Sequence, residues 1–147
     1  MILFATMVMV QETAPKIVVQ LNKTVFRPNE TVSGKVIVTF PGGLHGYQNP
    51  PTDVYQNPLK VAMEGKTFRI ISAKYPVGTD YTLPGTKDSY RVYLGETTVP
   101  ITVKAPSKPG NYPVSVNVLY QQCSDTTCFP PTSAIRKVIL KVERKKV

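Results

Sequence analysis

The residues of this chain that could carry out covalent chemistry are Cys123 and Cys128, the only cysteines in its 147 residues. Four small polar residues, 124–127, separate them, and the segment before Cys123 alternates apolar and polar side chains like a β-strand. A hairpin closed over such a loop places its flanking residues opposite each other, with Cα atoms about 4.5–5.5 Å apart, which suits a disulfide. The spacing therefore predicts a pair that can close.

A disulfide at this spacing would stabilise the fold only modestly. The chain-entropy model gives about 2 kcal/mol for so short a loop, against nearly 5 kcal/mol for a loop of about 100 residues. Exchange chemistry instead needs two thiols that can close on each other and one sulfur that an incoming thiolate can reach. A polar hairpin tip meets both conditions. From the spacing alone, reversible exchange and a fixed structural bridge both remain open.

The neighbours of the cysteines bear on this choice. The segment Phe129-Pro130-Pro131 follows the second cysteine, stiffens that flank and blocks pairing at the strand edge, so the tip stays free for a partner. Asp125 lies between the cysteines and would oppose thiolate formation if it is close to them.

Metal or cofactor binding is not predicted. Structural zinc needs four ligands, usually in two paired sets, whereas the chain offers two cysteines and a single histidine, His45. We expect His45 to be a loop or strand-edge residue rather than a ligand or a base, because nothing in the sequence places it beside a thiol.

The chain is basic, with 18 Lys and Arg against 9 Asp and Glu, a net charge of +9. Such a charge would suit an acidic partner, a nucleic acid or an anionic membrane surface. The basic residues nevertheless stand singly, apart from the terminal segment 143–146, and no cluster of basic and aromatic residues suggests base stacking. A solvated basic surface is the favoured interpretation, and no nucleic-acid partner is predicted.

The elements that position the cysteines are predicted to be β-strands. Apolar residues alternate with polar ones in the segments 17–21, 36–40 and 112–120, and further strands are expected at 59–63, 67–75, 89–94, 97–105 and 135–143. Turn signals occupy 27–30, 40–43, 77–80 and 107–111. Roughly seven to nine short strands at this spacing predict an all-β fold, an immunoglobulin-like antiparallel β-sandwich. The chain has no Trp and no widely spaced cysteine pair, so the likeness is one of architecture.

The connection at 45–61 is unusual, because YQNP occurs in it twice, at 47–50 and at 55–58. Its prolines rule out a central strand. It is either a proline-braced crossover between sheets or a rim that presents tyrosines to a partner protein.

The first 14 residues allow two interpretations. The segment 2–10 is apolar enough for the core of a signal peptide, but no basic residue precedes it and no clear cleavage site follows. Residues 1–14 are expected to be a signal remnant or an extra N-terminal strand, and residues 15–147 the immunoglobulin-like domain. No stretch reaches the roughly 18 apolar residues that span a bilayer.

The segment YQQCSDTTCFPP, residues 120–131, resembles the Y-Q-x-C…C-x-P-P signature of the N-terminal domain family of DsbD, the membrane thiol–disulfide interchange protein. Other features follow in the same order: 34–51 resembles the family's strand and histidine-containing turn, 57–61 its next strand entry, and 90–105 the strands before the cysteine hairpin. The likeness extends over roughly 34–140. The match favours exchange over a fixed bridge.

This resemblance implies an immunoglobulin-like domain that works outside the cytoplasm, in the bacterial periplasm, as a protein-disulfide reductase or interchange component. It would receive reducing equivalents from a thioredoxin-like protein or domain and pass them to oxidised partners, such as a disulfide isomerase or a cytochrome c maturation thioredoxin. Cys128 would form the mixed disulfide, and Cys123 would resolve it. The alternative is a non-catalytic immunoglobulin-like binding module with a structural hairpin disulfide.

In the same family a cap loop carrying an aromatic residue shields the cysteines. By position it should fall within 78–85, with Tyr81 or Leu83 as the covering side chain. The candidates for contact with a partner protein are Tyr47, Tyr55, Tyr120, Phe129 and Pro130. The membrane-spanning and thioredoxin-like parts of DsbD are missing from this sequence, so we expect an excised domain or a free-standing relative that works attached to or near a membrane protein.

Overall fold

β-Strands provide the regular secondary structure of residues 13–144, which are the residues that the computed structural model describes. In chain order they are β1 (Lys16–Leu21), β2 (Val25–Phe26), β3 (Thr31–Thr39), β4 (His45–Tyr47), β5 (Lys60–Met63), β6 (Arg69–Ala73), β7 (Thr79–Thr82), β8 (Ser89–Tyr93), β9 (Glu96–Lys104), β10 (Gly110–Tyr120), β11 (Gln122–Cys123) and β12 (Thr132–Val142). They form three four-stranded sheets, β1-β3-β9-β6, β2-β12-β10-β5 and β11-β4-β8-β7. The pairings are antiparallel, except that β2 runs parallel to β12.

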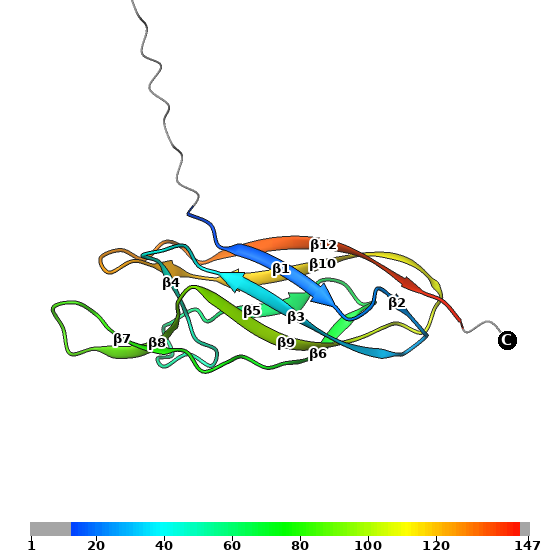
Figure 1. Cartoon of the computed structure of the whole chain (residues 1–147), viewed down its shortest axis with the longest axis horizontal. Coiled ribbons are helices and arrows are strands. Elements are labelled where there is room, and N and C mark those ends of the chain that lie inside the picture. Colours follow the sequence, from blue (N-terminus) through cyan, green and yellow to red (C-terminus); the bar gives the residue numbers. More distant parts are fainter. Residues whose placement is uncertain (1–12, 145–147) are drawn as a thin grey trace, which may run out of the picture.

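The first two sheets form the sandwich, and their long strands run along the molecule (Figure 1). One apolar core joins the alternate side chains of β3, such as Val36 and Val38, to those of β10, such as Val114 and Val116. Each buried side chain of this size contributes about 1.5–3 kcal/mol through removal from water. The alternation in the sequence thus produced the predicted immunoglobulin-like sandwich, and the fold class is confirmed.

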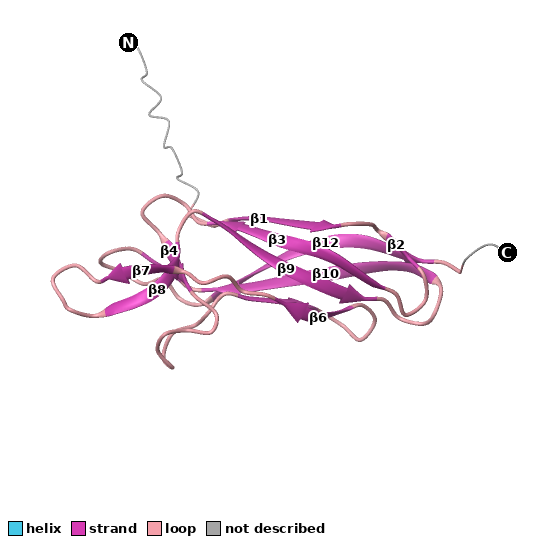
Figure 2. Ribbon diagram, turned by 60° about the horizontal axis from the view of Figure 1, so that its bottom comes forward, coloured by secondary structure: helices cyan, strands magenta, loops and turns pink. Residues whose placement is uncertain are grey.

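The third sheet lies at one end of the sandwich and contains β4, β7 and β8 (Figure 2). Of its strands, β8 was predicted from the sequence, and β11 lies at the end of the strand that was expected to run into Cys123. The turn predicted at 77–80 is partly wrong, because Thr79 already pairs with Val92 and opens β7. Strands of two to four residues, such as β4, β7 and β11, are too short to show an alternating pattern.

Gly46 connects this third sheet to the core. A Cβ atom at Gly46 would overlap the ring of Phe40, so only glycine lets β4 lie directly against that ring. The Phe40 ring in turn packs edge-on against Tyr120 at the end of β10, with ring centroids 6.5 Å apart. The sheet that carries the cysteines is therefore held against the end of the main core.

The predicted signal remnant or extra strand at 1–14 lies almost wholly outside the described residues. Within them, Thr13 accepts a hydrogen bond through its carbonyl oxygen from the side chain of Gln122, at 2.7 Å. In the part of the chain that the structure describes, no helix is long and apolar enough to cross a membrane.

Candidate functional site

The cysteine hairpin is closed by a disulfide between Cys123 and Cys128, whose Cα atoms are 4.0 Å apart. The Ser124 N–H donates to the carbonyl oxygen of Thr127 at 2.7 Å, and the Phe129 N–H donates to the carbonyl oxygen of Gln122 at 2.9 Å. The cysteines therefore face each other between these two backbone hydrogen bonds, as predicted, with Cα atoms closer than the predicted range of about 4.5–5.5 Å.

The turn at the tip is stabilised by its own side chains. The Ser124 hydroxyl accepts hydrogen bonds from the N–H groups of Thr126 and Thr127, at 3.2 and 3.0 Å. Serine in this position favours a tight turn because its side chain substitutes for a backbone acceptor. The tip is thus ordered even though residues 125–127 are exposed.

The two cysteines differ sharply in exposure. Cys123 is 1% exposed and belongs to a buried cluster with Tyr47 and Val92, whereas Cys128 lies on the surface. An incoming thiolate can therefore approach Cys128 and is kept from Cys123. Exchange at a disulfide depends on which sulfur can be attacked, so this asymmetry gives the two cysteines different chemical roles.

Tyr47 contacts both sulfurs of the disulfide. Its hydroxyl lies 3.3 Å from the Sγ of Cys123 and 3.6 Å from the Sγ of Cys128. A disulfide sulfur carries no proton, so the tyrosine donates in both contacts. Burial is the main cause of the raised pKa of Tyr47, and the charge effect of Tyr90 raises it further. The hydroxyl therefore keeps its proton at neutral pH. It is placed to stabilise negative charge on either sulfur when the bond breaks.

Aromatic rings fill the space around Tyr47. The ring of Tyr90, from β8, lies 5.8 Å from that of Tyr47 and 5.4 Å from that of Tyr81 on β7, measured between centroids. The ring of Tyr81 also lies 4.4 Å from that of His45 on β4, tilted by 41°. Because the four rings come from three neighbouring strands of one sheet, the pairing of β4, β7 and β8 builds this cluster.

Tyr81 also contacts the cysteine turn directly. Its hydroxyl donates a hydrogen bond to the carboxylate of Asp125. That bond, with smaller contributions from desolvation and from nearby negative charge, raises the pKa of Tyr81 to about 12. Half of the segment at 78–85, expected as a cap loop, is thus the strand β7, and one of its two candidate side chains reaches the turn. Leu83 lies half-buried at the following bend, where its N–H donates to the Asp88 carbonyl at 3.0 Å.

His45 is a member of the site that the sequence did not reveal. It pairs with Cys123 across β4 and β11, and its side chain is 2% exposed. Its Nε2 atom is buried without a hydrogen-bond partner among the described residues. Desolvation lowers the pKa of His45, and the charge of Asp125 opposes this in part.

The candidates for partner contact fall into two groups. Tyr55, which is 90% exposed, Phe129, which is 42% exposed, and Pro130 lie on the surface. Tyr47 and Tyr120 are buried, the first beneath the disulfide and the second against Phe40 in the core.

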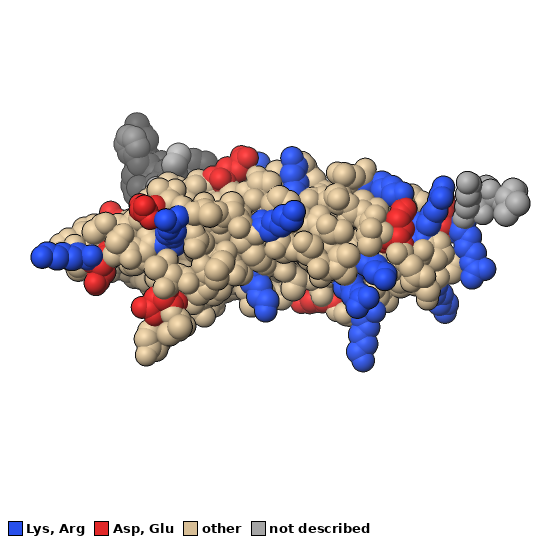
Figure 3. All heavy atoms as spheres, turned by 90° about the horizontal axis from the view of Figure 1, so that it is seen from below, with Lys and Arg blue, Asp and Glu red and all other residues tan. Residues whose placement is uncertain are grey.

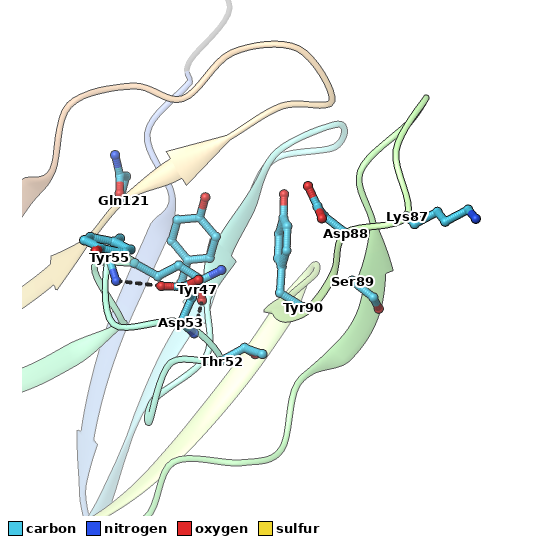
Figure 4. Close-up of a pocket in the computed structure, with 10 residues that line it drawn as sticks. Tyr47, Thr52, Asp53, Tyr55, Lys87, Asp88, Ser89, Tyr90 and Gln121 are labelled. Carbon is cyan, nitrogen blue, oxygen red and sulfur yellow. Dashed lines mark hydrogen bonds between the residues drawn. The ribbon is translucent and has the colours of Figure 1, made fainter.

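A pocket of about 600 Å³ lies beside the disulfide. Figure 4 shows the rings of Tyr47 and Tyr90 standing next to each other in its wall, with Tyr55 on the side of Tyr47 and Asp88 on the side of Tyr90. Tyr47 touches both sulfurs and also lines the pocket, so this side chain lies between the disulfide and the pocket.

The segment that carries Tyr55 is joined to the cysteine hairpin by side chains. The Asn57 amide donates to the side-chain oxygen of Gln121 at 3.0 Å, and the Gln121 amide donates to the carbonyl oxygen of Phe129 at 3.1 Å. Asp53 orders the turn itself, because its carboxylate accepts the N–H of Tyr55 at 3.0 Å. The turn that carries the exposed tyrosine is therefore tied to the cysteine hairpin.

Among residues 13–144 no group of three or more His, Cys, Asp or Glu side chains could hold a metal ion. Lys and Arg side chains are spread along the face seen in Figure 3 rather than gathered in one cluster. The side chains described around the disulfide are mainly aromatic, and Asp125 supplies a carboxylate in the cysteine turn.

Comparison with known proteins agrees with this geometry. Residues 15–140 match the family described as "Thiol:disulfide interchange protein DsbD, N-terminal". The reduced DsbD N-terminal domain of Neisseria meningitidis is 17% identical, with a TM-score of 0.54 over 85% of this chain and 86% of that one. The N-terminal periplasmic domain of ScsB from Proteus mirabilis is 12% identical, with a TM-score of 0.60 over 92% of this chain and 49% of that one. No curated protein sequence matches the chain.

At these identities the two structures show a shared fold, while the family match covers most of the chain and includes both cysteines. The resemblance first drawn from the cysteine signature is thereby confirmed. A sandwich with a disulfide at its end, one sulfur buried and the other on the surface, is an arrangement that supports thiol–disulfide exchange. The chain belongs to the family of DsbD N-terminal domains.

Proposed function

We propose that residues 15–147 form an extracytoplasmic thiol–disulfide exchange domain that passes reducing equivalents between a thioredoxin-like donor and oxidised partner proteins. The observation that carries this proposal is the difference in exposure between Cys123, at 1%, and Cys128, on the surface. Family membership supports the chemistry, and disulfides persist in oxidising compartments such as the bacterial periplasm.

In the reducing direction, a thiolate of the donor attacks the Sγ of Cys128. The new sulfur–sulfur bond to the donor forms as the bond between Cys128 and Cys123 breaks, and Cys123 leaves as a thiolate. The Tyr47 hydroxyl, 3.3 Å from that sulfur, stabilises the leaving charge. The donor's second thiol then displaces Cys128, so the donor is oxidised by two electrons and both cysteines are reduced.

In the delivering direction, the Cys128 thiolate attacks the disulfide of an oxidised partner and forms a mixed disulfide. Cys123 then attacks Cys128, restores the internal disulfide and releases the partner with both of its thiols reduced. A disulfide isomerase or a cytochrome c maturation thioredoxin would be an acceptor of this kind. The burial of Cys123 supports its assignment as the resolving thiol, because it can reach Cys128 but is kept from external disulfides.

Partner proteins would dock on the surface around Cys128. Tyr55 and Val54 are 90% and 88% exposed at the tip of the ordered turn, and Phe129 and Pro130 lie beside the attacked sulfur. Exposed aromatic side chains have few rotatable bonds, so they lose little conformational entropy on binding and often dominate interfaces. Tyr81 and Leu83 on the β7–β8 hairpin would act as the cap, because Tyr81 contacts Asp125 in the cysteine turn.

The experiment that tests the proposal is equilibration of the native protein with defined glutathione or thioredoxin couples. We expect the Cys123–Cys128 disulfide to equilibrate reversibly at a potential above about −300 mV. A bridge that stays oxidised until the protein is denatured would contradict exchange and would indicate a binding module with a structural disulfide.

Partners can then be identified by trapping. The Cys123→Ser variant keeps Cys128 but lacks the resolving thiol, so mixed disulfides with partners should accumulate. Cys128→Ser is the matched control and should trap none, because its remaining thiol is buried. Equal trapping by both variants would contradict the assignment of Cys128 as the attacking sulfur.

A further inference from the structure

His45 lies next to the thiol that must lose its proton in the resolving step. It is directly opposite Cys123 in the antiparallel pair β4–β11, and the Cβ atoms of such residues are about 4.5–5.5 Å apart with side chains on the same face. Tyr47, two positions along β4, shares that face, and its hydroxyl lies 3.3 Å from the Sγ of Cys123. The imidazole and the sulfur are therefore neighbours on one face of the sheet.

The imidazole is buried in a state suited to accepting a proton. The side chain is 2% exposed, and Nε2 has no hydrogen-bond partner among the described residues. Buried polar atoms without a partner are rare and call for an explanation, of which a catalytic role is one. Tyr81 covers the ring at 4.4 Å, which shields it further from water.

The groups that face His45 determine its charge. Tyr47 on β4 and Tyr81 on β7, whose rings lie against His45, have raised pKa values and stay neutral, as does Tyr90, which packs on both tyrosines; Asp125 in the cysteine turn supplies a negative charge. Desolvation lowers the pKa of His45, so the ring is neutral at pH 7 and free to accept. Asp125 would stabilise the imidazolium once it forms.

We propose that His45 is the general base that takes the proton from Cys123 when Cys123 resolves the mixed disulfide at Cys128. The inference rests on the proposed exchange function and names a further catalytic residue for it. The Cys123 proton passes to the imidazole, the Cys123 thiolate attacks the Sγ of Cys128, and the bond between Cys128 and the partner sulfur breaks. The internal disulfide forms, and the partner leaves as a thiolate that takes up a proton from the imidazolium or from water.

Ellman's reagent, 5,5′-dithiobis(2-nitrobenzoate), distinguishes the two cysteines because they react with it in two successive kinetic phases. With the reduced protein, the exposed Cys128 attacks the reagent first and releases one thionitrobenzoate, at a rate proportional to reagent concentration. Cys123 then closes the internal disulfide and releases the second, at a rate independent of reagent concentration. The second phase, followed at 412 nm between pH 5.5 and 9, measures the deprotonation and attack of Cys123.

With a neutral imidazole as base, the second-phase rate rises with pH through the pKa of His45 and is then level up to about pH 8.5, near the usual pKa of a thiol. In His45→Gln the plateau disappears, and the rate rises about tenfold per pH unit toward the thiol pKa. At pH 7 the variant is expected to be about 100-fold slower than the wild type, the lower end of what a general base contributes.

The matched control is Tyr112→Phe, which removes a hydroxyl that donates to the Lys108 carbonyl near the far end of β10. It should leave the second-phase profile unchanged. His45 is the only histidine of the chain, so its titration can be followed in the reduced wild type by NMR without any substitution. The kinetic pKa of the second phase should equal the NMR value, which keeps the test independent of how the variant folds.

The outcomes distinguish this inference from the function on which it rests. A wild-type second phase that rises at unit slope from pH 6.5 to 8.5, or the same profile in His45→Gln, overturns the base role while leaving exchange intact. A reduced wild-type protein in which no second thionitrobenzoate is released contradicts exchange itself, because Cys123 would then not resolve Cys128.

Discussion

Tyr47 and Cys123 form the chemical centre of the site at the scale of single residues. The tyrosine hydroxyl contacts both sulfurs, and burial keeps it protonated, so it can donate to whichever sulfur becomes a thiolate. Hydrogen bonds to charged groups contribute about 1.5–3 kcal/mol, more than those between neutral groups. The hydrogen bond from Tyr47 is therefore stronger when the disulfide breaks and a thiolate forms than when the disulfide is intact.

Tyr47→Phe should slow reduction of the disulfide by a thiol such as dithiothreitol by roughly 10- to 100-fold, which corresponds to the loss of that charge-assisted bond. The phenyl ring keeps the packing on Tyr90. The rate can be measured at pH 7 from the loss of the disulfide under pseudo-first-order conditions. Tyr90→Phe is the control, since the contacts of its ring with Tyr47 and Tyr81 are retained. Equal rates in Tyr47→Phe and wild type would show that the hydroxyl has no catalytic role.

The lowered pKa of His45 also predicts how stability depends on pH. The folded protein holds the neutral imidazole, while the unfolded chain binds a proton near the model value of 6.5. Below that value the unfolded state binds more protons, so the free energy of unfolding falls with decreasing pH until the folded-state pKa is passed. Urea denaturation at pH 7.5 and pH 5 should show this loss in wild type and a smaller loss in His45→Gln. An unchanged difference would mean that other groups cause the acid sensitivity.

The long strands of the sandwich were predictable from the sequence and the short strands of the site were not. Val114, Val116 and Val118 alternate over an 11-residue strand, so their buried face can be read directly. β4 and β11 have three and two residues, and their pairing depends on contacts between distant parts of the chain. The role of Tyr47, 76 positions from Cys123, therefore had no local signal. His45 was missed for the same reason, because its pairing with Cys123 is visible only in the fold.

The β7–β8 hairpin offers a test of the cap at the scale of one element. Tyr81→Phe keeps the ring contact with His45 but removes the hydrogen bond to Asp125, so the hairpin should separate from the cysteine turn more often. We expect severalfold faster alkylation of Cys128 in the reduced variant, measured with iodoacetamide at fixed pH. Leu83→Ala tests the other candidate. A rate increase in Leu83→Ala alone would assign the covering role to Leu83 instead.

The turn that carries Tyr55 should matter for protein partners and not for small thiols. Tyr55→Ala is expected to weaken exchange with a thioredoxin-like partner by about tenfold or more, the effect of losing an aromatic anchor, without changing reduction by dithiothreitol. Ile139→Ala is the matched control, because Ile139 is 75% exposed on β12 in the main sandwich. Equal effects of the two substitutions on the partner reaction would place the docking surface elsewhere.

At the scale of the whole molecule, the first described residues contact the end of the sandwich that carries the cysteines. The carbonyl oxygen of Thr13 accepts the side-chain N–H of Gln122, the residue before Cys123, and Gln122 is 6% exposed. The family match begins only at residue 15, so it leaves this contact out. The first residues that precede the matched domain thus contribute to the surroundings of the buried cysteine.

A chain beginning at residue 15 should fold into the same sandwich as one beginning at residue 12 but be less stable, by about 1–3 kcal/mol. The reason is that the buried Gln122 amide loses its partner, and an unpaired buried donor incurs most of its desolvation cost. Urea denaturation of both chains, with the disulfide intact, should show a lower midpoint and an unchanged slope for the shorter one. The substitution Gln122→Met in both chains is the control, since it should remove the difference between them. Equal midpoints without that substitution would place the N-terminal boundary of the domain at residue 15. If the shorter chain fails to fold, the boundary lies before Thr13.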